Sequence, residues 1–186
     1  ATYGEINTWV TTAITDMSSL FDSKTTFDSD ISNWDVSNVT NMASMFSSAT
    51  SFNQNIVGWN VSSVTNMRAM FSNANTFNSP LNNWDVSSVT DMRFMFEFAS
   101  AFQQPLNLWE VDSLTNGTNF MGITGAGGAI TYTGLDTLYN GWAANASIAT
   151  GITISFGNST FTGAGLAARN ILINTRGWTI TDGGQV

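Results

Sequence analysis

The sequence contains no cysteine and no histidine, and only 10% of its residues are charged. Without cysteine it can form neither a disulfide framework nor a thiolate metal site. Without histidine it lacks the imidazole group that Ser-His-Asp and Cys-His catalysis, many zinc sites and most proton transfer near neutral pH require. Because these absences exclude the commonest hydrolase and metalloenzyme mechanisms, we expect the protein not to be an enzyme.

Positive charge is especially scarce, with Lys+Arg 5 against Asp+Glu 13 and a formal net charge of -8. An acidic surface repels the phosphate backbone of nucleic acids and anionic lipid headgroups, so we expect neither as a partner. No apolar run approaches the roughly 18 residues of a membrane span. The polar surface must consist mainly of Asn, Ser, Thr and Gly, a bias that favours a secreted or cell-surface location.

The sequence is dominated by a repeat of 25 residues. Five tryptophans keep this interval: Trp9, Trp34, Trp59, Trp84 and Trp109. Three further sets of apolar residues follow them in register: Val39, Val64 and Val89; Met42, Met67 and Met92; Phe46, Phe71 and Phe96. A unit of this length cannot bury its apolar face alone, so neighbouring units must stack into one continuous core. The repeat therefore predicts a solenoid of five units over residues 1–121, of which the first and the last are degenerate.

Two periodicities alternate within one unit. Trp84 and Val86 lie two residues apart, which predicts a short strand with both side chains on one face. From Val89 to Ala99 apolar residues recur at intervals typical of one helix face, and Ser87 is placed to cap that helix. The predicted fold class is therefore an α/β repeat solenoid, a leucine-rich-repeat-like stack of short parallel strands and short helices.

Residues 122–186 depart from the repeat, beginning with the glycine-rich run "GITGAGG". Apolar spacing predicts helices after Thr133 and around 164–172, and alternation predicts strands at 151–156 and 178–181. We expect this segment to be an α/β cap that belongs to the same domain and covers the last strand edge, which would otherwise recruit another chain. A separate binding domain is the alternative.

The stretches "FNQNIVGWNVSSVTNMRAMF" and "FNSPLNNWDVSSVTDMRFMF" resemble the repeat of the BspA-like leucine-rich-repeat surface proteins of bacteria. The shared string is W-x-V-S-x-V-T-x-M-x-x-M-F, and the C-terminal "GWTITDGG" is similar to the segment that often closes such arrays. The resemblance implies an extracellular, non-catalytic protein that mediates attachment or recognition. Gly117, where the repeat has methionine, and the weak first copy depart from the pattern.

The repeat supplies two candidate ligand surfaces. The tryptophan column could offer aromatic platforms to sugar rings, but tryptophan shares a strand face with valine, which favours core packing. Strand alternation turns a second, polar column toward solvent, and it consists of Asn33, Asp35, Asn60, Asn83, Asp85 and Glu110. These side chains could bind a glycan or a protein, and Asp35 and Asp85 could bind Ca²⁺, which takes oxygen ligands. The ordinary alternative is a solvated face with no ligand, and we expect no obligatory cofactor.

We therefore expect a bacterial cell-surface module for adhesion or recognition, whose partner is a glycan or protein of a host or neighbouring cell. The alternative is a structural spacer or a self-assembling filament subunit without a dedicated ligand. The family resemblance favours recognition, whereas the uniformity of the repeat favours the structural role.

Overall fold

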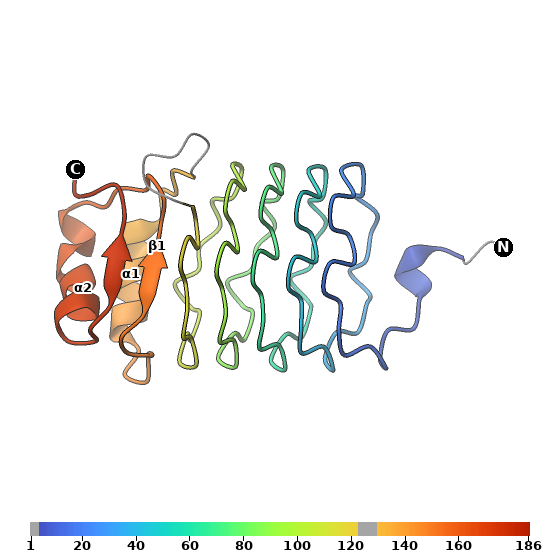
Figure 1. Cartoon of the computed structure of the whole chain (residues 1–186), viewed down its shortest axis with the longest axis horizontal. Coiled ribbons are helices and arrows are strands. Elements are labelled where there is room, and N and C mark those ends of the chain that lie inside the picture. The colour runs from blue at the N-terminus through green and yellow to red at the C-terminus, as the bar shows by residue number, and fades with distance from the viewer. Residues whose placement is uncertain (1–3, 123–129) are drawn as a thin grey trace.

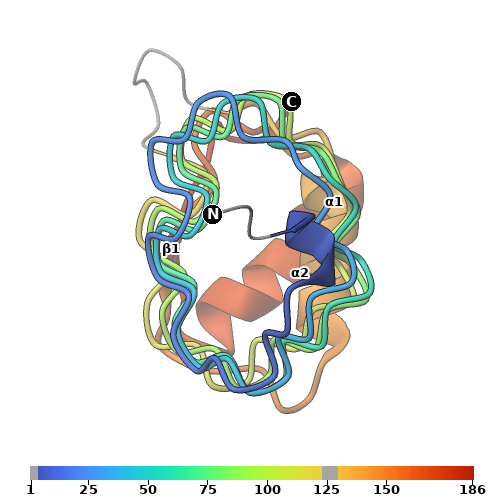
Figure 2. The same cartoon turned by 90° about the vertical axis from the view of Figure 1, so that its right-hand side faces the viewer.

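The computed structural model describes residues 4–122 and 130–186. The repeats form coils that lie side by side along the long axis of the molecule, and the C-terminal segment lies at one end of the row (Figure 1). Viewed along this axis, successive coils overlie one another in a common outline (Figure 2). The coils and the C-terminal segment share one buried apolar cluster, which runs from Met17 to Trp178.

Backbone hydrogen bonds join neighbouring coils along the Thr-Asn-Met-x-x-Met-Phe part of each unit. In the second coil the amides of Met42, Ser44 and Phe46 donate to carbonyl groups of the third coil at 2.8 to 2.9 Å. Equivalent bonds recur at each junction, and parallel bridges link equivalent residues: Asp16 to Asn41, Asn41 to Asn66, Asn66 to Asp91 and Asp91 to Asn116. This ladder fixes the register that the 25-residue interval predicts.

The predicted strand and helix within each unit are both wrong. Residues 84–86 form no strand, because the amide of Trp84 bonds within its own coil to the Leu81 carbonyl at 3.0 Å. No α-helix lies within the described residues 9–122, and the predicted helix over 89–99 is a series of turns that belongs to the ladder. Four-residue turns also bring apolar side chains inward every three or four positions, so they imitate a helical period.

Left-handed backbone conformations explain why these turns do not continue as a helix. In the second coil Ser44 and Ser48 have φ values of 57° and 56°. The equivalent described residues of the other coils are also left-handed: Ser19, Ser23, Ala69, Asn73, Phe94, Phe98 and Asn119. A right-handed helix cannot pass through such residues, and an L residue other than glycine adopts this conformation at a cost of roughly 1–2 kcal/mol. The ladder hydrogen bonds and the buried methionine and phenylalanine side chains offset that cost.

Ala69 gives a direct test of this backbone geometry, because its φ is 53° and its small side chain is only half buried. We expect Ala69→Val to lower the free energy of unfolding by about 1–2 kcal/mol, since a β-branched residue fits the left-handed region poorly. Ala69→Gly should leave stability unchanged or raise it by up to about 1 kcal/mol. Urea titrations of both variants check the contrast, and equal stabilities would contradict it.

Within the described residues, the C-terminal segment contains the helices and strands beyond the short 3₁₀ helix η1 (Ile6–Thr8). These are α1 (Leu135–Ala144), β1 (Thr153–Ser155), α2 (Gly163–Asn174) and β2 (Thr179–Thr181), close to the four elements predicted there. β1 and β2 pair in parallel, and the ladder reaches β1 through a bridge between Gly117 and Ile154. Most of the predicted glycine-rich boundary falls on residues 123–129, outside the described residues.

Local sequence explains where these helices begin and end. Leu135, Leu138 and Trp142 recur at helical spacing on the buried face of α1. Thr162 caps the start of α2, where its hydroxyl accepts a hydrogen bond from the Ala164 amide at 3.1 Å. Past α2, Gly177 has a φ of 70°, a conformation that favours glycine and turns the chain toward β2.

The C-terminal segment contacts the fifth coil through both backbone and side chains. The amides of Gly117 and Met121 donate to β1 carbonyls at 3.0 and 2.9 Å. The indole N–H of Trp142 in α1 donates to the Leu106 carbonyl at 3.1 Å, and the Trp142 ring packs 6.5 Å from that of Phe120. The C-terminal segment therefore packs on the fifth coil much as one coil packs on the next, although it consists of helices and strands instead of turns.

Candidate functional site

The polar column lies on the outer surface of the stack. Its side chains are all exposed, which is the orientation that the sequence predicts although no strand is present: Asn33, Asp35, Asn60, Asn83, Asp85 and Glu110. The column arises because the preceding tryptophan and the following valine both turn inward. Position along the coil, rather than strand alternation, therefore sets its outward direction.

One side-chain oxygen of Asp35, Asn60 and Asp85 holds the turn that follows each residue. Oδ1 of Asp85 accepts hydrogen bonds from the amide and hydroxyl of Ser87 at 3.1 and 2.6 Å. Asp35 bonds to Ser37 in the same way, and these two bonds, the hydroxyl first, lower the pKa of Asp35 below its ordinary value. Serine here thus donates to the acidic residue and does not cap a helix. The second carboxylate oxygen of each aspartate remains available to a ligand.

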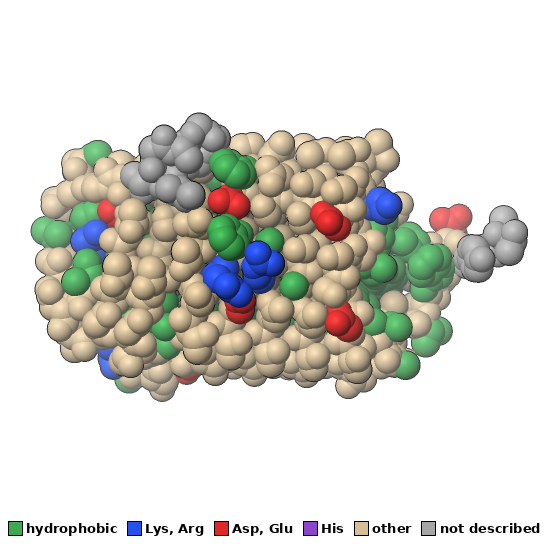
Figure 3. Space-filling model, viewed as in Figure 1, with side chains coloured by type: hydrophobic (Ala, Val, Ile, Leu, Met, Phe, Trp, Pro, Cys, Tyr) green, Lys and Arg blue, Asp and Glu red, His purple; other side chains and the backbone are tan. Residues whose placement is uncertain are grey.

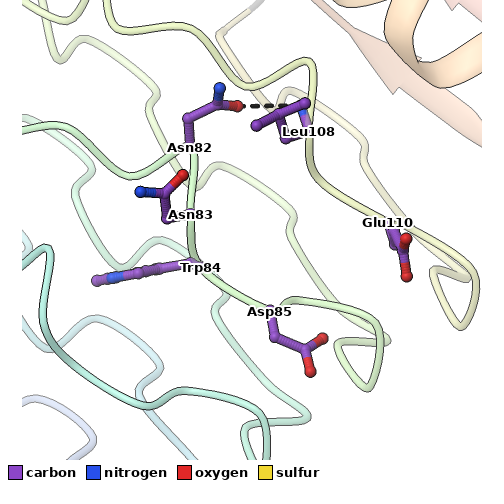
Figure 4. A pocket seen from close by; sticks show the side chains of 6 residues that line it. All are labelled: Asn82, Asn83, Trp84, Asp85, Leu108 and Glu110. Atoms are coloured by element: carbon purple, nitrogen blue, oxygen red, sulfur yellow. Dashed lines mark hydrogen bonds between the residues drawn. The ribbon is translucent and has the colours of Figure 1, made fainter.

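A shallow hollow of about 290 Å³ lies at the C-terminal end of the column, between the fourth and fifth coils. Asn83, Asp85 and Glu110 line it with polar groups, and Figure 4 shows the carboxylates of Asp85 and Glu110 pointing outward from neighbouring coils. The Trp84 ring points the opposite way, into the stack (Figure 4). The hollow therefore presents amides and carboxylates that suit a ligand rich in O–H or N–H donors.

Two further residues, Asn82 and Leu108, line the hollow although the polar column predicted from sequence does not include them. The Asn82 side-chain oxygen accepts a hydrogen bond from the Leu108 amide at 3.0 Å, which joins the two coils (Figure 4). The Leu108 side chain is 61% exposed. The sequence alone shows that leucine is unusual at this position, because the earlier units have polar residues or glycine there: Thr8, Asn33, Gly58 and Asn83. Leucine gives the hollow one apolar wall.

The structure does not bring the two predicted calcium ligands together. Asp35 and Asp85 belong to coils that are separated by a complete coil, which corresponds to roughly 10 Å at the usual spacing of paired chains. Asn60 occupies the position between them. Within residues 4–122 and 130–186, no group of three acidic residues is arranged to hold a metal ion.

The tryptophan column lies in the core. Trp34, Trp59, Trp84 and Trp109 are between 1% and 4% exposed. The valine, methionine and phenylalanine columns are buried beside them: Val39, Val64, Val89, Met42, Met67, Met92, Phe46, Phe71 and Phe96. Buried rings do not offer a face to a sugar, so the aromatic-platform interpretation has no support at these four positions.

Each of these indoles also makes a hydrogen bond that sequence reasoning missed. The N–H of Trp84 donates to the Ile56 carbonyl of the preceding coil at 3.2 Å, and that of Trp109 donates to the Leu81 carbonyl at 2.8 Å. The same bond recurs at Trp34 and Trp59. Tryptophan is therefore one of the residues that join neighbouring coils outside the backbone ladder.

The repeats match the model of a known protein family over most of the chain. The model described as "Mycoplasma protein of unknown function, DUF285" matches residues 1–109 and 51–124. No curated protein and no solved structure matches the chain. No helix in the described part of the molecule has both the length and the apolar character needed to cross a bilayer. Since the matched residues make up well over half of the sequence, the chain belongs to the DUF285 family, a repeat family of unknown function.

Proposed function

We propose that the protein is a non-catalytic bacterial surface module for adhesion or recognition, built as a leucine-rich-repeat-like solenoid related to the BspA-like proteins. Its ligand, a glycan or a protein of a host or neighbouring cell, binds at the polar column and the adjoining hollow. The proposal assigns the chain an extracellular or cell-surface location. An acidic chain with a net charge of -8 gives no support to a nucleic-acid partner.

One observation supports this proposal. Successive coils each present an outward hydrogen-bonding side chain at the same position, above a buried apolar core. Asp35, Asn60 and Asp85 share one turn geometry, which fixes the side-chain oxygens before any ligand arrives. A preorganised surface loses less conformational freedom on binding than a mobile one. A regular array also suits a ligand that itself repeats, such as a polysaccharide.

The second candidate is a structural spacer or filament subunit, and the N-terminal end of the stack favours it. Val10 and Leu20 are 86% and 45% exposed there. Figure 3 shows apolar side chains gathered at that end. Together with Trp9, Ile14 and Met17 they line an apolar hollow of about 250 Å³. Apolar surface of this kind is typical of a contact with another polypeptide.

The decisive experiment replaces Asp35 and Asp85 together with alanine and measures binding to arrays of glycans and host surface proteins. We expect binding to be abolished and the melting temperature to fall modestly, because each alanine also removes the two hydrogen bonds that hold one exposed turn, worth about 0.5–1.5 kcal/mol each. A variant with both residues changed to asparagine keeps the turn, as Asn60 does, and tests the charge alone. Removing two distant exposed charges, Glu5 and Asp22, is the control and should leave binding intact.

Other outcomes would contradict the assignment. If the wild-type chain binds nothing on broad panels and forms ordered assemblies at modest concentration, the filament role replaces recognition. If the Asp35 and Asp85 variants bind normally and Trp84→Ala is stable but no longer binds, the tryptophan column is the ligand surface instead.

A further inference from the structure

On the outward side of the ladder, the side chains of one region differ from those at the equivalent positions of the other coils. In the second coil the outward positions carry small residues: Ala43, Ser44, Ser47 and Ser48. The equivalent positions of the fourth coil carry large or charged residues: Arg93, Phe94, Glu97 and Phe98. Arg68 of the third coil lies beside them, because its guanidinium packs over the Phe94 ring at 5.5 Å. We call these five residues, Arg68 together with the four of the fourth coil, the Arg-Phe patch.

The fold does not require aromatic residues at these positions. Phe94 and Phe98 have φ values of 60° and 59°, in the left-handed region that bulky side chains rarely adopt. Serine, alanine and asparagine hold the same conformation in the sister coils. Both phenylalanines are only half buried, so they contribute less to the core than the inward columns do. Strained backbone of this kind is more often found at binding sites than elsewhere.

The patch also concentrates positive charge in a chain that has little of it. Two of the five basic residues of the sequence, Arg68 and Arg93, lie here. Arg93 is already paired, because its Nε donates to Asp91 at 2.9 Å. Arg68 is exposed and makes no direct ion pair within the described residues. Although burial opposes the shift, Arg93 and, less strongly, the charge of Arg68 lower the pKa of Asp91. Figure 3 shows these charged and apolar side chains gathered on a face that is otherwise mostly uncharged.

Three observations lead to a proposal: the large residues at positions that are small in the second coil, the left-handed phenylalanines, and the exposed Arg68 guanidinium that makes no direct ion pair. We propose that the Arg-Phe patch binds an acidic protein surface. A carboxylate of that partner pairs with Arg68, and neighbouring apolar side chains pack on Phe94 and Phe98. Aromatic residues and arginine are enriched at the centres of protein interfaces, where they supply most of the binding energy. Acidic residues elsewhere on this chain act weakly on the contact, because salt screens charges beyond about 8 Å at physiological ionic strength.

This surface is distinct from the polar column. The residues of the column directly precede or follow a tryptophan, whereas the Arg-Phe patch lies on the outward side of the ladder between residues 68 and 98. The inference therefore does not depend on a ligand at the column. Glu97 stands between the two phenylalanines in the sequence, and its partial burial raises the pKa of its carboxyl group.

The test uses two sets of synthetic twelve-residue peptides. In one set Asp or Glu alternates with Leu or Phe, and in the other Asn or Gln replaces every acidic residue. We expect the wild-type protein to bind the acidic set at least tenfold more tightly in 50 mM salt, with an affinity that falls as salt is raised. Arg68→Ala and the double variant Phe94→Ser/Phe98→Ser restore the residues of the second coil and should each weaken binding at least tenfold.

Stability and a second surface provide the controls. The double serine variant should melt no lower than the wild type, because the second coil is built with serine at both positions. Asp85→Ala, which alters the polar column, should bind the acidic peptides normally. Equal binding of the acidic and amide peptide sets would overturn the proposal, as would unchanged binding by the serine variant. Preferential binding to phosphatidylglycerol vesicles would identify a membrane contact and overturn it as well.

Discussion

Removal of residues 122–186 is expected to abolish cooperative unfolding and to cause aggregation. The truncated chain loses the β1 carbonyls that accept from Gly117 and Met121, and Trp142 no longer covers Phe120. The fifth coil would then expose Trp109 and Phe120 together with an open ladder edge. An uncovered edge and a large apolar face both promote association between chains.

Thermal melting followed by circular dichroism, together with size-exclusion chromatography, checks this result against the full chain. A soluble monomeric truncation that melts cooperatively at the same temperature would contradict it. Residues 122–186 would then be a separate domain and not a cap.

Replacement of Trp84 with alanine is expected to lower the free energy of unfolding by roughly 3–5 kcal/mol. The indole is 3% exposed, and its ring packs at 6.5 Å from that of Trp59. The substitution leaves a cavity and also removes the hydrogen-bond donor of the Ile56 carbonyl. Both effects act on two coils at once, because the indole bridges them.

Trp9 offers a matched control, since it occupies the same repeat position but is 44% exposed. Trp9→Ala should cost less than half as much stability as Trp84→Ala in urea titrations under the same conditions. Similar effects of the two substitutions would show that position in the repeat, and not burial, determines the energetic contribution of tryptophan.

The register and the core of the repeats could be predicted from sequence because they depend only on spacing. Apolar residues that recur every 25 positions must face the same interior if the units stack, whatever their local backbone. For the same reason Asp85, which lies between inward Trp84 and Val86, had to face outward. In the C-terminal segment ordinary helical spacing at Leu135, Leu138 and Trp142 was enough to place α1.

Local secondary structure within the repeats could not be predicted in the same way. The intervals from Val89 to Ala99 fit a helix, yet Phe94 and Phe98 adopt left-handed conformations that no residue preference signals. Such conformations persist because bonds to the next coil hold them, for example from the Phe94 amide to the Thr118 carbonyl at 3.1 Å. Contacts between residues 24 or 25 positions apart thus override local preference.

The candidate site was predicted in part. Outward direction followed from the repeat, whereas the hollow depends on how two coils meet, as shown by the bond from Leu108 to Asn82. The Arg-Phe patch could have been found by comparing the units position by position, since Phe94 replaces the small Ser19, Ser44 and Ala69 of earlier units. Its proximity to Arg68 required the structure, because the two residues belong to different coils.

The most direct test of the proposed recognition surface is a nuclear magnetic resonance titration of the ¹⁵N-labelled protein with a ligand from the glycan or protein arrays. Our account predicts that the largest shift changes lie at the amides of Asn83, Asp85 and Glu110 and at the equivalent turn positions of earlier coils. Amides of the buried ladder, such as Phe71, should change little. Shift changes confined to the C-terminal segment, with none along the polar column, would contradict it.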